Sequence, residues 1–554
     1  MKLLLAAINA KYIHSNPAVH SLKACAGEWE SAVEIAEYTI NQPVGQIRAD
    51  IYRRHPDMIG FSCYIWNIGI VEALVRDLAA VLPQTDIWMG GPEVSYDVSE
   101  RLRSLPIRGV MAGAGENSFR RLAKAYAEGR QDELPACLAE EPVPLSQIPF
   151  WYRDLTEFEN RIIYYESSRG CPFSCSYCLS SIDRSLSFRD PEQVKEELTF
   201  FLEKKVPQVK FIDRTFNCKK SHALAIWRFL AEHDNGITNF HFEIAADLID
   251  EEMLTVLEGL RPGQVQLEIG VQSTCPKTVE AIHRKMDFAR VAEVVTRIRS
   301  RHNIHVHLDL IAGLPWEDYV RFGQSFDDVY ALHPEQLQLG FLKVLKGSAM
   351  AEAAASWGIV YTAAAPYEVM ATSWISYDEI LRLKQIEEVL ELYYNSGQFT
   401  HTIREMEKHF PSAFAMYEQL ADWYETHDYF GIQSSRVVRY DRLLGFLQEK
   451  DPEREAQYRE LLTYDLYLRE HMKNRPAFAP VQTEAVKERI SGWMAEAAEG
   501  RHTPEGYEGM TYRELVKQLH GEVFTDADGG ERLLIFDYRR RDSLTMDARV
   551  IEWR

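Results

Sequence analysis

The chain has 554 residues, a formal net charge of −21, and a hydrophobic content of 46%. This length predicts about three domains, each large enough to bury a core without disulfide bonds. The acidic balance disfavours nucleic acid as a partner, because binding to a phosphate backbone needs a basic surface. No run approaches the roughly 18 apolar residues that a membrane span needs, so no membrane partner is expected.

The N-terminus and the cysteines favour a cytoplasmic protein. Residues 3–8 are apolar, but Asn9 and Lys11 cut the run short and no small-residue cleavage site follows. We therefore predict a first strand and not a signal peptide. Five of the eight cysteines are scattered along the chain, which fits a reducing compartment better than a disulfide framework.

Residues 1–129 alternate between strand-like and helix-like patterns. The helical spacing of apolar residues is clear in 67–82, and Pro17 and Pro43 stand where helices would begin. The alternation predicts a doubly wound, Rossmann-like parallel sheet. Its expected strands are the apolar runs 3–8, 33–40, 58–64, 86–89 and 109–111.

Small and polar residues follow the strands of this predicted sheet. In open α/β sheets, ligands bind beyond the carboxyl ends of the strands, and glycine lets a ligand approach the backbone closely. One glycine pair after a strand is typical of a turn, but their occurrence after several strands predicts a ligand site. The candidate binding residues are Ser62, Gly90, Gly91, Gly113, Gly115 and Glu116.

Residues 130–159, where prolines stand among acidic residues, are predicted to be a linker.

Three cysteines after this linker form the most specific motif of the chain. Cys171, Cys175 and Cys178 have the spacing C-x3-C-x2-C. This spacing lets one loop direct three thiolates at a [4Fe-4S] cluster and leaves one iron without a protein ligand.

Two alternatives to a cluster remain for this loop. A structural zinc site needs a fourth cysteine or histidine at short spacing, and the nearest histidine, His222, lies far downstream. A chance grouping of buried thiols is the second alternative. It is disfavoured because three of only eight cysteines fall within eight positions.

Residues 160–362 continue as repeated strand and helix patterns. Five strand-like runs follow the first run at 162–165, and helical stretches fill the gaps between them. Six such units predict a partial (β/α)6 barrel, which builds its site at the carboxyl ends of its strands. Glu243 or Glu268 could alternatively be an interior ion-pair partner. The candidate residues at these ends are Asp213, Glu243, Glu268, Gln272, Ser273 and Asp309.

From residue 363 to residue 554 the pattern predicts a mostly α-helical C-terminal domain. Its long helical segments are expected at 379–394, 403–425 and 437–449, and their aromatic residues are expected in its core, although they could line a substrate cavity. The end of the chain predicts two strands, 532–538 and 548–553, around a basic turn at 539–542.

The cysteine loop, with Tyr177 before its third cysteine, resembles the signature of the radical S-adenosylmethionine (SAM) superfamily. The resemblance implies that the three cysteines hold the cluster, that its open iron binds SAM, and that an electron donor such as flavodoxin or ferredoxin reduces it. Residues 268–273 resemble the family's ribose-contacting segment, and residues 309–315 resemble its adenine-contacting turn.

The segments 60–62, 90–91 and 113–116 resemble the cobalamin-binding domain that precedes the radical core in one subgroup of this superfamily. Cobalamin domains that ligate cobalt from below carry Asp-x-His-x-x-Gly after the first strand. Residues 11–17 lack the Asp and the Gly, so His14 is expected to be a surface or turn residue, and cobalt ligation by His14 is the alternative. Tyr64 or Trp66 could cover the lower face of the corrin instead.

The resemblance implies an enzyme that uses cobalamin and SAM to methylate an unactivated carbon of a small-molecule substrate. Ring closure or oxidation by the same cofactors is the alternative within enzymes. Non-catalytic cobalamin binding is disfavoured by the intact cysteine triad, and tRNA modification by the absence of a basic C-terminal barrel pattern. We also expect residues 367–430 to close the open side of the barrel; the alternative is that they only support it.

Overall fold

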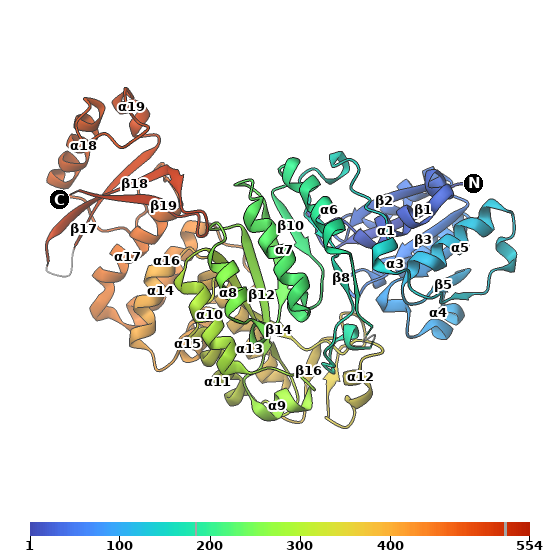
Figure 1. Ribbon diagram of the computed structural model, residues 1–554. Helices are drawn as coiled ribbons and strands as arrows, with labels where there is room; N and C mark the ends of the chain where they lie inside the picture. The colour runs from blue at the N-terminus through green and yellow to red at the C-terminus, as the bar shows by residue number, and fades with distance from the viewer. Residues whose placement is uncertain (183–184, 526–528, 554) are drawn as a thin grey trace. The chain divides into compact units, whose positions relative to one another are not determined.

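The computed structural model describes residues 1–182, 185–525 and 529–553 (Figure 1). The chain forms two compact units. The first comprises Met1–Phe322 with Leu339–Ile380, and the second comprises Gly323–Gln338 with Leu381–Arg554. Within the described ranges, no helix is both long enough and apolar enough to cross a membrane.

The first unit begins with a six-stranded parallel sheet in the order β2-β1-β3-β4-β5-β6. Its strands are β1 Leu3–Asn9, β2 Val33–Thr39, β3 Met58–Ser62, β4 Asp86–Gly90, β5 Gly109–Met111 and β6 Cys137–Leu138. The five predicted strands are confirmed. The sixth, β6, was not predicted, because two residues in a proline-rich stretch carry no periodic signal.

Alternate residues of β1 serve the two faces of this sheet. Leu4 packs with Ile51 and Leu74 in one core cluster, whereas Leu5 packs with Phe119 in another. These partners come from α2 Val44–Arg54, α3 Ile68–Val81 and α5 Gly115–Ala127, and the other helices of this sheet are α1 Pro17–Cys25 and α4 Val98–Ser104 (Figure 1). Full burial of each such side chain stabilises the folded state by about 1.5–3 kcal/mol. Because successive side chains of a strand point to opposite faces, a strand that is apolar throughout favours helices on both faces of its sheet.

The second sheet has the strand order β14-β13-β12-β11-β10-β7. Its strands are β7 Ile163–Tyr165, β10 Gln208–Phe211, β11 Asn239–Ile244, β12 Val265–Gln272, β13 Ile304–Ala312 and β14 Gln336–Phe341. The neighbouring pairs from β7 to β13 are parallel. Six strands in chain order confirm the predicted partial barrel.

Helices fill the gaps between the barrel strands, as predicted. They are α6 Pro191–Glu203, α7 Lys220–Glu232, α8 Glu251–Glu258, α9 Pro276–Ala281, α10 Phe288–Ser300 and α11 Tyr319–Tyr330. The cysteine loop lies between β8 Ser168–Arg169 and β9 Ser187–Phe188, which pair in antiparallel fashion. The short elements α12 Ala349–Ala353, β15 Val360–Tyr361 and β16 Val369–Ala371 follow β14.

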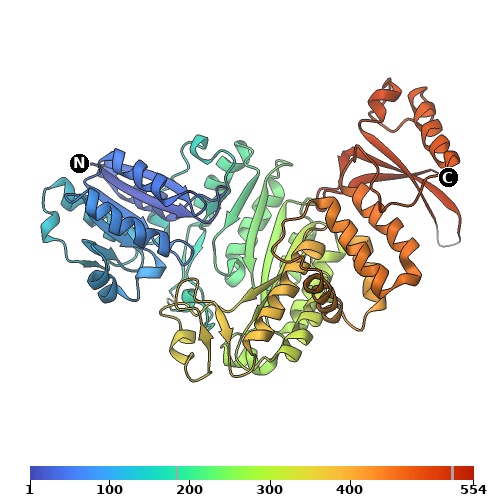
Figure 2. The ribbon, with the colours of Figure 1, turned by 180° about the vertical axis from the view of Figure 1, so that it is seen from behind.

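The C-terminal region is mostly helical, as predicted, and ends in a small antiparallel sheet (Figure 2). Its helices are α13 Tyr377–Leu390, α14 Thr400–Met406, α15 Ala413–Thr426, α16 Arg436–Lys450, α17 Glu455–Arg469, α18 Glu484–Ala498 and α19 Tyr512–Leu515. The single helix predicted over 403–425 is wrong. Pro411 breaks it, and Ser412 caps α15 by accepting a hydrogen bond from the Ala415 backbone.

The predicted pair of C-terminal strands around a basic turn also needs correction. The sheet has three strands, β17 Leu519–Thr525, β18 Glu531–Arg541 and β19 Ala548–Trp553. The arginines Arg539 to Arg541 continue β18, where Arg541 pairs with Ala548. Charge alone suggested a turn, but β18 projects these side chains outward from the sheet. His520 and Glu522 hid the strand pattern of β17.

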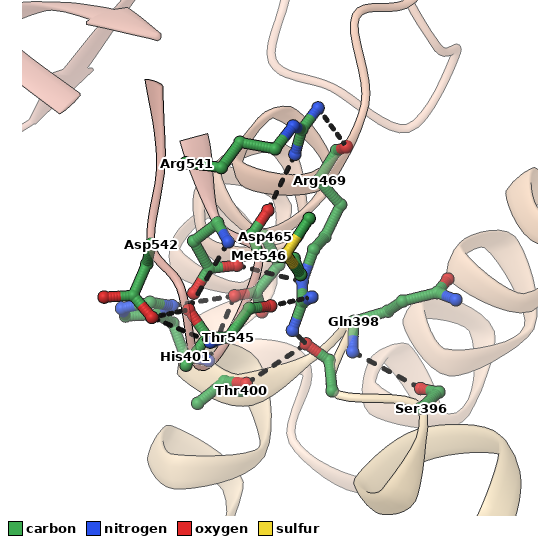
Figure 3. A network of polar contacts seen from close by, with 12 residues as sticks. Ser396, Gln398, Thr400, His401, Asp465, Arg469, Arg541, Asp542, Thr545 and Met546 are labelled. Atoms are coloured by element: carbon green, nitrogen blue, oxygen red, sulfur yellow. Dashed lines mark hydrogen bonds and ion pairs between the residues drawn. The ribbon is translucent and has the colours of Figure 1, made fainter. Parts of the chain in front are cut away.

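Arg469 ties three segments of the second unit together (Figure 3). Its side chain, at the end of α17, donates hydrogen bonds to the backbone oxygens of Gly397 and Thr545. One turn earlier, the buried Asp465 accepts bonds from the His401 backbone and ring. These contacts connect α17 to the start of α14 and to the β18–β19 turn.

Candidate functional site

Two of the cavities in the first unit lie at the carboxyl ends of its two large sheets, one at each sheet. The first cavity has a volume of about 470 Å³ and lies beyond β3, β4 and β5 of the N-terminal sheet. The second cavity has a volume of about 200 Å³ and lies between the cysteine loop and strands β10 to β13 of the barrel. These are the positions at which parallel α/β sheets bind ligands.

The first cavity brings together all six residues predicted from the N-terminal strand ends: Ser62, Gly90, Gly91, Gly113, Gly115 and Glu116. Gly91 has a φ of +114°, and a Cβ there would lie 2.6 Å from the backbone oxygen of Cys63. A Cβ on Gly113 would meet no heavy atom within 4 Å. The turn at Gly91 therefore needs glycine, and the space beside Gly113 is open.

An ion pair joins the wall of the first cavity to the cysteine loop. The Arg169 Nη2 atom lies 2.9 Å from Glu116 Oε1 and 2.7 Å from Glu166 Oε2. Burial alone would raise the pKa of Glu116, but the charge and hydrogen bond of Arg169 lower it below its usual value. Arg169 stands two residues before Cys171, so this ionised carboxylate anchors the start of the loop.

His14 does not line the first cavity, whereas Tyr64 does. The Nδ1 atom of His14 lies 2.5 Å from the hydroxyl of Tyr164 in β7. Tyr64 stacks on Trp66 with ring centroids 4.3 Å apart, so the pair offers a flat aromatic surface at the cavity.

The three cysteines line the second cavity together. Thr215 Oγ1 lies 3.5 Å from Cys171 Sγ, and Arg284 Nη1 lies 3.7 Å from Cys175 Sγ. Burial raises the pKa of Cys175, and the nearby Arg284 charge opposes this effect. Of the described residues that line this cavity, none is a fourth cysteine or a histidine. The donor set therefore suits an iron–sulfur cluster with one open iron better than a closed zinc site.

Two carboxylates of the barrel face the same cavity in different states. Glu268 Oε2 lies 2.8 Å from His241 Nε2 and 3.3 Å from Lys210 Nζ. Burial opposes ionisation of Glu268, but these contacts lower its pKa to about 2. For Glu243, burial dominates and raises the pKa to about 7. Glu268 is thus both an ion-pair partner and a cavity residue, and Glu243 can change its charge near neutral pH.

Gln272 and Asp309 complete the polar wall of the second cavity. Gln272 has a left-handed φ of +74°, uncommon outside glycine, where the pairing of β12 with β13 shifts register. Its Oε1 atom is buried without a hydrogen-bond partner among the described residues. Asp309 Oδ1 lies 3.0 Å from His307 Nε2. The buried Gln272 Oε1, which has no partner in the described part of the chain, can therefore accept a hydrogen bond from a ligand hydroxyl or amine.

Asp213 and Ser273 lie outside the linings of both cavities. Asp213 is fully buried and accepts hydrogen bonds from the backbone and hydroxyl of Ser167 at 3.0 and 2.6 Å. Burial raises its pKa to about 6. Ser273 donates to Glu317 at 2.7 Å and accepts from the Cys275 backbone at 3.0 Å. Both side chains support the segments that form the second cavity.

Three families match separate parts of the chain. Residues 3–123 match the B12 binding domain, and residues 165–329 match the Radical SAM superfamily. Residues 355–532 match a family described as "Protein of unknown function (DUF4080)". The chain therefore combines a B12-binding domain with a radical SAM domain. The cofactors that define these two domains are cobalamin, a [4Fe-4S] cluster and SAM.

Curated relatives match about half of this chain. The cobalamin-dependent radical SAM methyltransferase TokK of Streptomyces tokunonensis is 25% identical over 304 residues, which cover 47% of this chain and 43% of TokK. The chain spans between 43% and 66% of the length of four curated relatives.

Two solved structures share the fold of this chain. TsrM from Kitasatospora setae, with cobalamin and a [4Fe-4S] cluster bound, matches with a TM-score of 0.53 and 17% identity over 66% of this chain and 80% of TsrM. OxsB, with aqua-cobalamin and SAM bound, matches with a TM-score of 0.56 and 13% identity over 93% of this chain and 83% of OxsB. The chain therefore has the fold of cobalamin-dependent radical SAM enzymes.

Proposed function

We propose that this protein is a cobalamin-dependent radical SAM methyltransferase that methylates an unactivated carbon of a small molecule. The observation that carries the proposal is the pair of adjacent cavities, one in each cofactor domain, with one side chain, Arg214, in the lining of both. The similarity to TokK supports a methyl transfer. When bound, the cluster with SAM supplies a hydrogen-abstracting radical, and cobalamin supplies a methyl group.

The cysteine loop is proposed to hold the cluster through Cys171, Cys175 and Cys178. Its donor set fits, because three thiols line one cavity without a fourth thiol or an imidazole among the described lining residues. Thr215 and Arg284 contact two of these sulfur atoms, at 3.5 and 3.7 Å. The hydrogen bond from Arg284 stabilises negative charge on the Cys175 sulfur, and this is one of the ways in which proteins set the potential of a cluster.

The barrel residues Glu243, Glu268, Gln272 and Asp309 are proposed to hold SAM. The orphaned Gln272 Oε1 and the carboxylates accept hydrogen bonds, and SAM offers an ammonium group and two ribose hydroxyls as donors. Asp213 and Ser273 do not reach this cavity, so we assign them a positioning role. Asp213 holds the segment that leads into the cysteine loop, and Ser273 holds the chain that follows β12.

The first cavity is proposed to hold cobalamin through Ser62, Gly90, Gly91, Gly113, Gly115 and Glu116. Five glycines at its strand ends let a broad, flat ring system approach the backbone of this cavity of about 470 Å³, where larger side chains would block it. Tyr64, stacked on Trp66, would cover one face of the ring. His14 is bound to Tyr164 and is not assigned as a cobalt ligand.

We also propose that a flavodoxin or a ferredoxin donates electrons to the cluster.

The closure of the barrel by residues 367–430 stays a prediction. Tyr367 itself belongs to the first unit, where it donates a hydrogen bond to the buried Glu93, and Lys346 Nζ lies 3.4 Å from the same carboxylate.

An incubation with SAM separates methylation from the other radical reactions. The protein is reconstituted anaerobically with iron, sulfide and hydroxocobalamin, reduced, and supplied with SAM and a small-molecule cell extract. Methylation predicts that 5′-deoxyadenosine and S-adenosylhomocysteine both form, because one SAM is cleaved and a second donates its methyl group. Deoxyadenosine without S-adenosylhomocysteine would instead favour ring closure or oxidation.

A further inference from the structure

We propose that the substrate carries an anionic group, a carboxylate or a phosphate, and that Arg214 binds this group between the two cavities. The inference rests on the proposed function and narrows its substrate class. Arg214 follows the carboxyl end of β10, its side chain is exposed, and it lines both the first and the second cavity.

The residues on either side of Arg214 fix the direction of the chain. Asp213 is turned inward and held by hydrogen bonds from Ser167 and Ser168. Thr215 contacts Cys171 Sγ at 3.5 Å in the second cavity. Because contacts hold the side chains of both Asp213 and Thr215, the backbone at Arg214 is anchored on two sides. The long side chain of Arg214 therefore extends from a fixed point beside the cysteine loop.

The charge of Arg214 is not neutralised by the described part of the chain. No described carboxylate forms an ion pair with it, whereas Arg169 is paired with Glu116 and Glu166. Arg284, the third guanidinium at these cavities, donates to a backbone oxygen and contacts Cys175. Arg214 is therefore the guanidinium at these cavities that remains available for a ligand. Lys285 also lines the second cavity without a described ion pair, but only Arg214 lines both cavities.

The field of Arg214 reaches one group in each cavity. Burial raises the pKa of Glu243 to about 7 in the second cavity, and Arg214 opposes this shift. Burial also raises the pKa of Tyr64 to about 12 in the first cavity, where Arg214 again favours the anion. A negative group brought into either cavity would thus meet the same attraction.

A guanidinium at this position suits a carboxylate or phosphate better than a neutral group. Its fork of N–H donors can form two parallel charge-assisted hydrogen bonds, which fix orientation as well as distance. Holding a substrate by such a group would place its reacting carbon reproducibly between the two cofactor domains. SAM also carries a carboxylate, so the test must separate the two sources.

The experiment uses the reconstituted full chain, hydroxocobalamin and SAM labelled with a CD3 group. A small-molecule cell extract is divided on an anion-exchange resin into retained and unretained fractions, and labelled products are found by mass spectrometry. We expect the labelled product only from the retained, anionic fraction. Arg214→Gln should lower its formation by about tenfold or more, because a charge-assisted hydrogen bond is lost, and Arg214→Lys should lower it less.

Two further measurements keep the outcomes distinct. The affinities of Arg214→Gln for SAM and for hydroxocobalamin should match those of the wild type. Lys219 is an exposed cation five positions later that lines neither cavity, so Lys219→Gln should form as much labelled product as the wild type. A product from the unretained fraction, unchanged labelling by Arg214→Gln, or a tenfold loss of SAM affinity in that variant would overturn the inference. If the wild type labels nothing in either fraction, the proposed function itself fails.

Discussion

The two strand-end cavities of the first unit differ in their lining. The first combines five glycines with mostly apolar and aromatic side chains, and the second combines three thiols with carboxylates and cationic side chains. In the function we propose, glycines at the strand ends leave room for a broad ligand in the first cavity, whereas polar side chains hold compact charged ligands in the second. Added atoms should therefore damage the first cavity, and removed atoms should damage the second.

The largest effect is expected in the second cavity. Cys171→Ala, Cys175→Ala and Cys178→Ala should each abolish iron binding after anaerobic reconstitution, because a cluster with two protein ligands dissociates. Hydroxocobalamin binding should persist in all three. Iron and sulfide analysis with cobalamin absorbance checks this. Cys218→Ala is the matched control, and an equal loss of iron in that variant would show that the three-ligand assignment is wrong.

The reverse pattern is expected for the first cavity. Gly90→Leu should weaken hydroxocobalamin binding about tenfold or more and leave the iron content unchanged, since a Cβ there already lies 3.5 Å from Met111 and a longer side chain extends into the hollow. Gly69→Leu, on the exposed side of α3 with no heavy atom near its Cβ, is the control. Unchanged cobalamin affinity in Gly90→Leu would place the cofactor elsewhere.

A smaller effect concerns the pH dependence of the second cavity. Burial raises the pKa of Glu243 to about 7, so its carboxylate forms as pH rises through neutrality. Because the anion attracts the ammonium group of SAM, SAM affinity should rise several-fold between about pH 6 and 7.5. Equilibrium binding of SAM to the reconstituted protein measures this. Glu243→Gln should remove the dependence, and a variant that keeps it would exclude Glu243 as its source.

The smallest effect is expected for His14. Its Nδ1 atom is engaged by the Tyr164 hydroxyl at 2.5 Å, and it does not line the first cavity. His14→Ala should therefore leave hydroxocobalamin affinity within about twofold of the wild type. Electron paramagnetic resonance of the cob(II)alamin form gives the decisive reading. Nitrogen splitting in the wild type that disappears in His14→Ala would make His14 a cobalt ligand.

Sequence patterns predicted the strand ends well but not the direction of every side chain. The glycines and carboxylates that line the cavities were found because parallel strands bring their carboxyl ends to one edge. Asp213 and Ser273 stand at the same ends but do not line a cavity. Asp213 accepts a hydrogen bond from the Ser167 hydroxyl, and Ser273 donates to Glu317 and accepts from the Cys275 backbone. Such choices depend on partners distant in sequence, which no local pattern contains.

The arginines at the cavities show the same limit. Arg284 lies in a loop after α9 and meets Cys175 across 109 positions of sequence. Arg214 gains its importance only because two cavities adjoin it. In the C-terminal sheet, β17 was missed because His520, Gly521 and Glu522 interrupt its apolar residues, and its pairing with β18 supplies the register that the sequence does not.

We propose that one chain binds cobalamin in the first cavity and a [4Fe-4S] cluster in the second. The most direct test is the iron, sulfide and cobalt content of one anaerobically reconstituted preparation, measured for the wild type, Cys171→Ala and Gly90→Leu. The account predicts about four iron, four sulfide and one cobalt per wild-type chain, loss of iron alone in Cys171→Ala, and loss of cobalt alone in Gly90→Leu. A wild-type chain that binds only one of the two cofactors, or variants that lose both together, would contradict it.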